Sequence, residues 1–370
     1  ILLEHFKTLS FHLDLKEEDR FFWFTTTGWM MWNMLVSGLL LGTTVIMYDG
    51  SPIYPDSGVL WELAEEMKIT YFGTSAAYLQ ACLKAGMSPA DYLDLSSLRS
   101  IGSTASPLSS EGFHWVYENV RNDVHLASFS GGTDMCTGFL GSCPLLPVYA
   151  GEIQCIGLGA KVEAYGPDGE SLVGQVGELV LTKPLPSMPV NLWGDKDGTL
   201  YEESYFSVYP GIWRHGDWIK ITDRNTCIIY GRSDATLNRA GVRMGTSEFY
   251  RILERFDEVD DSLILQTSRR DGKDLLYLFV VLGDGIEFSD DLKDRIRETI
   301  RFELSPRHVP NKMYEIDQVP MTISGKKMEV PIMKILSGES PDNVISSGAM
   351  RNPESLQYFI DMAHSQLELE

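Results

Sequence analysis

Residues 231–243 read Gly-Arg-Ser-Asp-Ala-Thr-Leu-Asn-Arg-Ala-Gly-Val-Arg, and the sequence pattern differs on either side of them. Upstream, strand-like and helix-like runs alternate over residues 1–150, which predicts part of a large α/β domain with helices packed on a sheet. Short strands separated by Gly, Pro and Asp follow over 151–233 and predict a β-rich subdomain of that domain. Downstream, residues 235–336 predict a small α+β domain. The expected fold class is therefore α/β, with a large domain followed by a small one.

The expected elements fill this outline. In the large domain, strands are expected at 45–48, 69–73, 100–103 and 125–128, and helices at 59–68, 76–85 and 109–120. In the β-rich part, strands are expected at 153–156, 161–165, 178–182, 218–221 and 226–230. In the small domain, helices are expected at 246–256 and at 290–304, the latter capped by Ser289, and strands at 262–266 and 275–282. Residues 337–370 are expected to form a loop and a terminal helix, with Asn352 as its cap and Pro353 in its first turn.

The composition indicates a globular protein with more than one domain. The chain has 370 residues, too many for one compact core, and 44% of them are hydrophobic. The formal net charge of −21 argues against non-specific nucleic-acid binding, which needs a basic surface. The five cysteines are scattered and lack metal-binding spacing, which suits a reducing compartment such as the cytoplasm.

The most apolar stretch, residues 29–47, carries no charge and is almost long enough to span a bilayer. Polar residues inside it, and the break at Gly42-Thr43-Thr44, favour a buried helix followed by a strand. We therefore expect no membrane span here, and the sequence shows no signal or transit pattern.

Three motifs follow one another along the chain: Gly216-Asp217, then Gly231-Arg232-Ser233-Asp234, then Ser324-Gly325-Lys326. In this order they resemble the motifs of the acyl-adenylate-forming enzymes, which activate a carboxylate with ATP and pass the acyl group to coenzyme A. The resemblance implies an acid–thiol ligase that uses ATP, Mg²⁺ and coenzyme A, with a mobile small domain. It also implies a Ser/Thr/Gly-rich phosphate loop ending in Lys. This sequence contains no such loop, so we expect a large N-terminal part of the protein to be missing from it.

Two segments at predicted strand ends are candidates for nucleotide binding. Ser130-Gly131-Gly132-Thr133-Asp134 combines a Gly-rich turn with a hydroxyl and a carboxylate, which suits phosphate and Mg²⁺. By resemblance Gly132 and Thr133 contact the nucleotide, Asp134 holds the metal where the family has Glu, and Thr133 and Asp134 are catalytic. The segment Ala105-Ser106-Pro107 would flank the adenine, although the family often has Gly-Glu-Pro there. Ordinary turns remain the alternative for both segments.

The resemblance assigns roles to four charged residues near the domain junction. Asp217 would accept hydrogen bonds from both ribose hydroxyls. Arg232 and Arg243 would contact phosphate or ribose, although surface salt bridges are an alternative for both. Asp234 would be the hinge about which the small domain rotates.

The small domain carries the remaining candidates. Lys326 would be the adenylation lysine, reaching the carboxylate and the α-phosphate as charge develops. Its neighbour Lys327 leaves the register open, and the Ser-Gly-Lys match favours Lys326. Gly241 and Arg301 match positions near the coenzyme A tunnel and its 3′-phosphate, with a solvated helix face as the alternative for Arg301.

The acid is expected to be short but larger than acetate. By resemblance Trp29, Thr104 and Gly131 line the acyl pocket, and acetate-activating relatives carry Trp at the position of Gly131. An absent indole, which would bury roughly 150–250 Å², predicts a wider pocket. The whole pattern, from His5-Phe6-Lys7 onward, is similar to that of family members acting on acetoacetate. Two alternatives stay open: a ligase for another short or branched acid, and a non-catalytic nucleotide- or acyl-binding protein.

Overall fold

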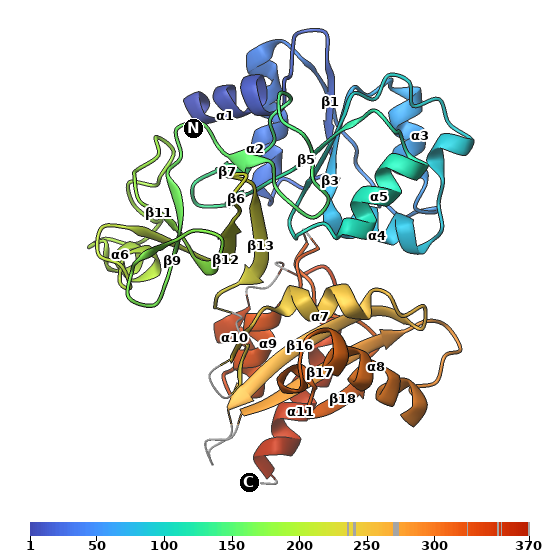
Figure 1. Cartoon of the computed structure of the whole chain (residues 1–370), viewed down its shortest axis with the longest axis vertical. Helices are drawn as coiled ribbons and strands as arrows, with labels where there is room; N and C mark the ends of the chain where they lie inside the picture. Colours follow the sequence, from blue (N-terminus) through green and yellow to red (C-terminus); the bar gives the residue numbers. More distant parts are fainter. Residues whose placement is uncertain are drawn as a thin grey trace. The chain divides into compact units, whose positions relative to one another are not determined.

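The chain folds into two compact units in the computed structural model, which describes residues 1–234, 237–239, 242–268, 274–323, 325–345, 348 and 350–368 (Figure 1). The first unit runs from Ile1 to Ile229 and the second from Tyr230 to Glu370. The predicted hinge residue, Asp234, lies close to the start of the second unit.

A five-stranded parallel sheet with the order β2-β1-β3-β4-β5 forms the centre of the first unit. Its strands are β1 (Arg20–Trp23), β2 (Thr44–Ile46), β3 (Tyr71–Ser75), β4 (Ser100–Thr104) and β5 (His125–Ser128). The helices are α1 (Leu2–Lys7), η1 (Thr8–His12), α2 (Met30–Val36), η2 (Ser37–Leu41), α3 (Val59–Glu66), α4 (Ala76–Lys84), η3 (Pro89–Asp91) and α5 (Ser110–Asn119). The predicted alternation of strands and helices is confirmed. Strand β1 and helix α1 were not predicted.

Both faces of this sheet are covered by packed side chains. Neighbouring residues of β1 point to opposite faces: Phe22 packs with α3, α4 and α5, whereas Phe21 and Trp23 pack with η1 and α2. Glycines make room for the Trp23 indole. A Cβ atom at Gly73 would lie 2.0 Å from Trp23 Cε3, and one at Gly102 would lie 2.6 Å from Trp23 Cη2.

The apolar run 29–47 forms α2, η2 and β2, as predicted. Gly42 ends η2 with a φ of +76°, a left-handed conformation that glycine adopts at little cost. Among the described residues, no helix combines the length and the apolar character needed to cross a membrane.

The β-rich part contains two antiparallel sheets, with the orders β6-β7-β8 and β10-β9-β11-β12-β13. Its elements are β6 (Ser130–Gly132), β7 (Thr137–Gly141), β8 (Cys155–Ile156), β9 (Val162–Tyr165), β10 (Ser171–Leu172), β11 (Val176–Leu181), α6 (Thr199–Tyr205), β12 (Trp213–Ile221) and β13 (Cys227–Arg232).

Strand β12 corrects one expectation, because Asp217 lies within a strand and not before one. The pairing of β11 with β12 shifts between Glu178 and Val180, and residues 215–217 bulge out of the ladder around Gly216, whose φ is +86°. A bulge of this kind re-aims the side chains beside it, which periodicity alone does not reveal.

The second unit holds a three-stranded sheet with the order β16-β17-β18. Its elements are β14 (Leu237–Arg239), β15 (Val242–Met244), α7 (Thr246–Leu253), β16 (Val259–Ser268), β17 (Asp274–Leu282), α8 (Asp290–Glu303), η4 (Pro306–His308), β18 (Lys312–Glu315), α9 (Glu329–Leu336), α10 (Pro341–Val344), η5 (Pro353–Ser355) and α11 (Leu356–Glu368). Alternate residues of β17 bury against opposite layers: Leu278 packs with α7 and α8, and Phe279 packs with α9 and α11.

The ends of the helices in this unit test the caps that the sequence predicts. Ser289 caps α8 as predicted, because its Oγ accepts a hydrogen bond from Leu292 N at 3.3 Å. The segment before the terminal helix, which is expected to be a loop, contains the short helix α10. Asn352 does not cap the terminal helix with its side chain. Its Oδ1 accepts from Met321 N at 3.0 Å and its Nδ2 donates to Val319 O at 2.9 Å, so it pins a distant segment.

Candidate functional site

The carboxyl ends of β4 and β5 bring two predicted site segments together. The strands are parallel neighbours, so their ends lie at the same edge of the sheet, where α/β folds commonly bind ligands. Phe129 N donates to Ser103 O at 3.0 Å, and Thr104 Oγ1 donates to Phe129 O at 2.9 Å. These bonds hold the expected adenine segment beside the expected phosphate turn.

Ala105, in the expected adenine segment, has a φ of +78°. This left-handed conformation costs a residue with a Cβ roughly 1–2 kcal/mol. The family that the sequence resembles often has Gly at this position, which is consistent with a positive φ.

We expect Ala105→Gly to raise the free energy of unfolding by about 1 kcal/mol, because glycine adopts a positive φ without the Cβ clash. Urea unfolding measures this change. Ala85→Gly is the matched control, since Ala85 has a φ of −72° and is exposed; glycine there is expected to lower the free energy of unfolding. Equal effects of the two changes would contradict the prediction.

Gly131 lies where no side chain fits, which corrects the argument for a wide acyl pocket. It pairs with Gly138 across the β6–β7 hairpin. A Cβ at Gly131 would lie 2.2 Å from Thr137 O and 2.7 Å from Gly138 Cα. A Cβ atom at this position would collide with the backbone of β7, so the missing side chain does not by itself indicate open volume beside Gly131.

Thr133 and Asp134 are exposed in the turn after β6. The Asp134 carboxylate accepts a hydrogen bond from Tyr205 Oη, and the Tyr205 ring stacks on Trp213 with centroids 3.6 Å apart. Tyr205 comes from α6, a helix that was not predicted, so sequence reasoning missed it. The only available hint was the aromatic run in residues 201–213.

The surroundings of Asp134 fit a Mg²⁺ ion held mainly by nucleotide. Within the described part of the chain, no group of three or more His, Cys, Asp or Glu side chains could hold a metal by itself. A single exposed carboxylate next to a hydroxyl matches the way Mg²⁺ is usually bound, with one or two carboxylates and substrate phosphates.

Asp217 is almost buried on the β12 bulge, and its Oδ2 lies 3.5 Å from His215 Nε2. The His215 ring packs edge-on against Phe139 of β7, with centroids 4.7 Å apart. Its Cε1 lies 3.0 Å from the position of a Cβ on Gly132. Asp217 is thus connected through His215 to the phosphate turn. His215 was missed although it stands two residues before Asp217.

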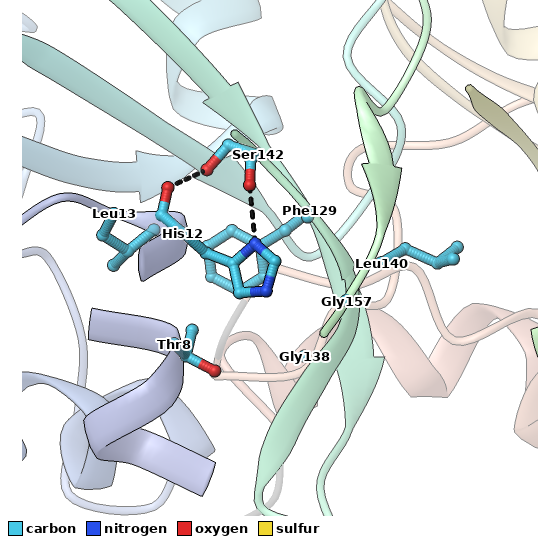
Figure 2. Close-up of a pocket in the computed structure, with 9 residues that line it drawn as sticks. Thr8, His12, Leu13, Phe129, Gly138, Leu140, Ser142 and Gly157 are labelled. Atoms are coloured by element: carbon cyan, nitrogen blue, oxygen red, sulfur yellow. Dashed lines mark hydrogen bonds between the residues drawn. The ribbon is translucent and has the colours of Figure 1, made fainter. Parts of the chain in front are cut away.

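The first two helical segments brace the hairpin that follows the phosphate turn. His5 Nε2 donates to Cys136 O at 2.6 Å. His12 Nδ1 donates to Ser142 O at 2.7 Å (Figure 2). His12 Nε2 accepts from Leu158 N at 3.0 Å, which fixes the neutral tautomer with its proton on Nδ1. The cavity beside His12 measures about 10 Å³, enough for about one water molecule, and is therefore no substrate site.

The buried His5 and His12, together with the half-buried His125 of β5, predict that the protein loses stability at acid pH. Burial lowers the pKa of His5, His12 and His125 below 6.5. Because the unfolded chain then binds protons more readily, their contribution to stability is complete above about pH 6.5 and is lost as the pH falls below it. For His12, a proton on Nε2 would also break the bond from Leu158.

We expect the urea midpoint to be lower at about pH 5.5 than at about pH 7.5, and His12→Gln to reduce that difference. The exposed His114 provides the control, since His114→Gln is expected to keep the whole difference. A midpoint that does not change with pH in the unmodified protein would contradict the prediction.

In the second unit, the two adjacent lysines have different surroundings. Lys326 is exposed. Lys327 Nζ donates to Asp261 Oδ1 and to Ser262 O, both at 2.6 Å, and lies 3.9 Å from the centroid of the Tyr250 ring. A side chain held in this way is not available to a ligand, which supports Lys326 as the candidate for chemistry.

Arg232 and Asp234 form a bidentate ion pair. Arg232 Nε donates to Asp234 Oδ1 at 3.0 Å, and Arg232 Nη2 donates to Asp234 Oδ2 at 2.8 Å. The predicted nucleotide contact and the predicted hinge therefore bind each other in this structure. The Asp234 carboxylate occupies Nε and Nη2 of the Arg232 guanidinium, which carries five N–H donors in all.

The remaining residues predicted to bind the acyl group, the nucleotide or coenzyme A lie in separate elements. Trp29 is half-buried at the start of α2 and packs on the sheet face that holds Trp23. Arg301 is exposed in the last turn of α8. Arg243 lies in β15, and Gly241 lies outside the described residues.

Comparison with known proteins gives consistent matches. Residues 2–188 match the family model described as AMP-binding enzyme. The chain is 43% identical over 366 residues to acetoacetyl-CoA synthetase of Gallus gallus, and 46% identical over 358 residues to acetoacetyl-coenzyme A synthetase of Rhizobium meliloti (strain 1021). These alignments cover 99% and 97% of this chain but 54% of each relative, so the chain spans about half the length of the curated relatives it matches.

Two solved structures are also similar. Acetoacetyl-CoA synthetase from Streptomyces lividans has a TM-score of 0.90 and 47% identity, over 99% of this chain and 56% of that one. The anthranilate CoA ligase AuaEII, solved in complex with anthranoyl-AMP, has a TM-score of 0.75 over 88% of this chain and 61% of its own. At 17% identity the second match shows the fold alone.

Proposed function

Because the chain belongs to the AMP-binding enzyme family, we propose that this protein is an ATP-dependent acid–thiol ligase that converts acetoacetate to acetoacetyl-CoA. In the first step, a carboxylate oxygen of acetoacetate attacks the α-phosphorus of ATP, and pyrophosphate leaves. In the second step, the sulfur of coenzyme A attacks the acyl carbon, and AMP leaves. The observation that carries the proposal is the shared edge of β4 and β5, which holds residues 104–107 beside residues 130–134.

The residues of the first unit contact different parts of the nucleotide in this proposal. Thr133 donates a hydrogen bond to the α-phosphate, and the exposed Asp134 carboxylate would hold Mg²⁺ together with phosphate oxygens. When bound there, Mg²⁺ would supply positive charge against the phosphate oxygens. Asp217, oriented by its contact with His215, accepts the ribose hydroxyls. Residues 105–107 flank the adenine.

The residues of the second unit supply charge and motion. Lys326 stabilises the charge that develops between the carboxylate and the α-phosphate. Arg232 and Arg243 contact the nucleotide, Gly241 and Arg301 lie along the path of coenzyme A, and Asp234 is the hinge. The bidentate pair of Arg232 with Asp234 supports a connection between the nucleotide and the hinge.

The choice of acid follows the relatives and not the pocket. The chain is 43% and 46% identical to two enzymes named for acetoacetyl-CoA, whereas a Cβ at Gly131 would collide with Thr137 O and gives no argument for a wide pocket. We place Trp29 and Thr104 beside the acyl group. We also propose a cytoplasmic location, in line with five free cysteines.

The test is coenzyme A-dependent AMP release by the product of the complete gene, with acetoacetate, acetate, butyrate and 3-hydroxybutyrate as acids. We expect the highest kcat/KM with acetoacetate. A higher value for another of these acids would keep the ligase and replace its substrate. No release with any acid, together with nucleotide binding measured by calorimetry, would favour a non-catalytic nucleotide-binding protein.

A further inference from the structure

The loop that carries Lys326 is closed by its own hydrogen bonds. Thr322 N donates to Lys326 O at 2.9 Å, and Lys326 N donates to Thr322 Oγ1 at 3.0 Å. Met321 and Lys327 form an antiparallel bridge at the base of this loop. The orientation of Lys326 therefore depends on how residues 321 and 327 are held.

Residue 321 is held from the C-terminal segment. Met321 N donates to Asn352 Oδ1 at 3.0 Å, and Arg351 N donates to Met321 O at 2.9 Å. This side of the loop is fixed mainly through backbone groups.

Residue 327 is held by its side chain. The Lys327 ammonium group donates to the Asp261 carboxylate and to the Ser262 carbonyl, and the face of Tyr250 lies beneath it. Asp261 and Ser262 belong to β16, and Tyr250 belongs to α7. One ammonium group thus ties the loop to a strand and a helix of the packed core.

The Tyr250 side chain that contacts Lys327 is itself held by a hydrogen bond. Tyr250 Oη donates to Glu329 Oε1 at 3.1 Å, and Thr246 Oγ1 donates to the same oxygen at 3.3 Å. Glu329 is the first residue of α9 and follows Lys327 closely in the chain. The ring on which Lys327 rests is consequently fixed at both its face and its hydroxyl.

We propose that Lys327 is a positioning residue for the adenylation step, which orients Lys326 by tying the base of its loop to β16 and α7. This inference rests on the proposed function, in which Lys326 acts on the carboxylate and the α-phosphate. The geometry suits lysine specifically. A compact ammonium group with three donors can serve a carboxylate, a carbonyl and an aromatic face at once. The planar fork of arginine does not match this arrangement.

The test separates the two half-reactions in the product of the complete gene. Acetoacetate-dependent exchange of pyrophosphate into ATP measures adenylation, and thioester formation from preformed acetoacetyl-AMP measures the second step. We expect Lys327→Met to lower the kcat of adenylation by about 100-fold, the effect of a displacement of about 1 Å in a reacting group. The KM values for ATP and acetoacetate, and the rate of thioester formation, are expected to stay unchanged.

Two further variants control for folding and for loss of charge. Asp261→Asn keeps the shape of the side chain and two of the three Lys327 contacts, so it is expected to give a smaller loss in the same step. If Lys327→Met does not fold, the adenylation rate of Asp261→Asn tests the positioning role in its place. Lys312→Met removes an exposed lysine of β18 and is expected to change neither half-reaction.

Two results would overturn the proposal: normal adenylation in folded Lys327→Met, or an equal fall in both half-reactions. Lys326→Ala, measured in parallel, distinguishes the two possible failures. If Lys326→Ala adenylates normally, the assigned role of Lys326 is wrong and the positioning role falls with it. If Lys326→Ala is inactive and Lys327→Met is normal, the positioning role alone is wrong.

Discussion

Replacing Lys326 with alanine is expected to lower the rate of acyl-adenylate formation by about 10²–10³-fold, and to leave thioester formation from preformed acyl-adenylate unchanged. In the proposed role, the Lys326 ammonium group stabilises charge that develops only while the acid attacks the α-phosphorus. Once the adenylate exists, that charge has left with pyrophosphate. Exchange of pyrophosphate into ATP and single-turnover thioester formation measure the two steps separately.

The exposed position of Lys326 makes this prediction specific, because alanine at an exposed position leaves no cavity in a packed core. Lys312→Ala, at another exposed lysine of the second unit, is the control and is expected to retain both activities. An equal loss in the two half-reactions of Lys326→Ala would rule out the assigned role.

Gly131→Trp is expected to lower the rate of adenylation by about 100-fold with every acid. It is not expected to shift the preference from acetoacetate to acetate. A Cβ at this position would lie 2.2 Å from Thr137 O, so any side chain displaces the β6–β7 hairpin. Thr133 and Asp134 stand at the turn of that hairpin and move with it. Overpacking of this kind also lowers stability, by about 1–3 kcal/mol.

Gly131→Ala separates this expectation from a pocket-filling role. If the contact of a Cβ with the β7 backbone causes the loss, Gly131→Ala lowers kcat/KM nearly as much as Gly131→Trp does. If an open pocket lies beside Gly131, alanine is harmless and tryptophan favours acetate over acetoacetate. Gly141→Ala on the same hairpin is the control, because the nearest atom to a Cβ there is Phe129 Cβ at 3.9 Å. The measurement is kcat/KM for acetate and acetoacetate in each variant.

Local sequence signals predicted those parts of the fold that depend on local chemistry. The parallel strands β3, β4 and β5 and the helices between them follow from short apolar runs and helical spacing, which each segment carries within itself. Ser289 caps α8 because a serine oxygen accepts a bond from an amide three residues away. The polar residues and the glycine break within the apolar run 29–47 also predicted a buried helix and a strand, and no membrane span.

The errors arose where residues distant in sequence decide the structure. Strand β12 begins before Asp217 because β11 pairs with it across a bulge. Asn352 looked like a helix cap, but Met321 and Val319 engage its amide. Tyr205 and His215 were missed because their partners, Asp134 and Asp217, were assigned from motifs that do not include them.

The sequence by itself determined the family and the order of its motifs, because these are properties of residue types and spacing along the chain. It also determined the layered α/β architecture, since each strand and helix encodes its buried face locally. Only the tertiary structure decided that Gly131 has no room for a side chain, because the obstructing carbonyl belongs to Thr137 on the returning strand. The Ser-Gly-Lys match favoured Lys326 over Lys327, and only the tertiary structure revealed that Asp261 and Tyr250, far from Lys327 in sequence, hold the Lys327 ammonium group.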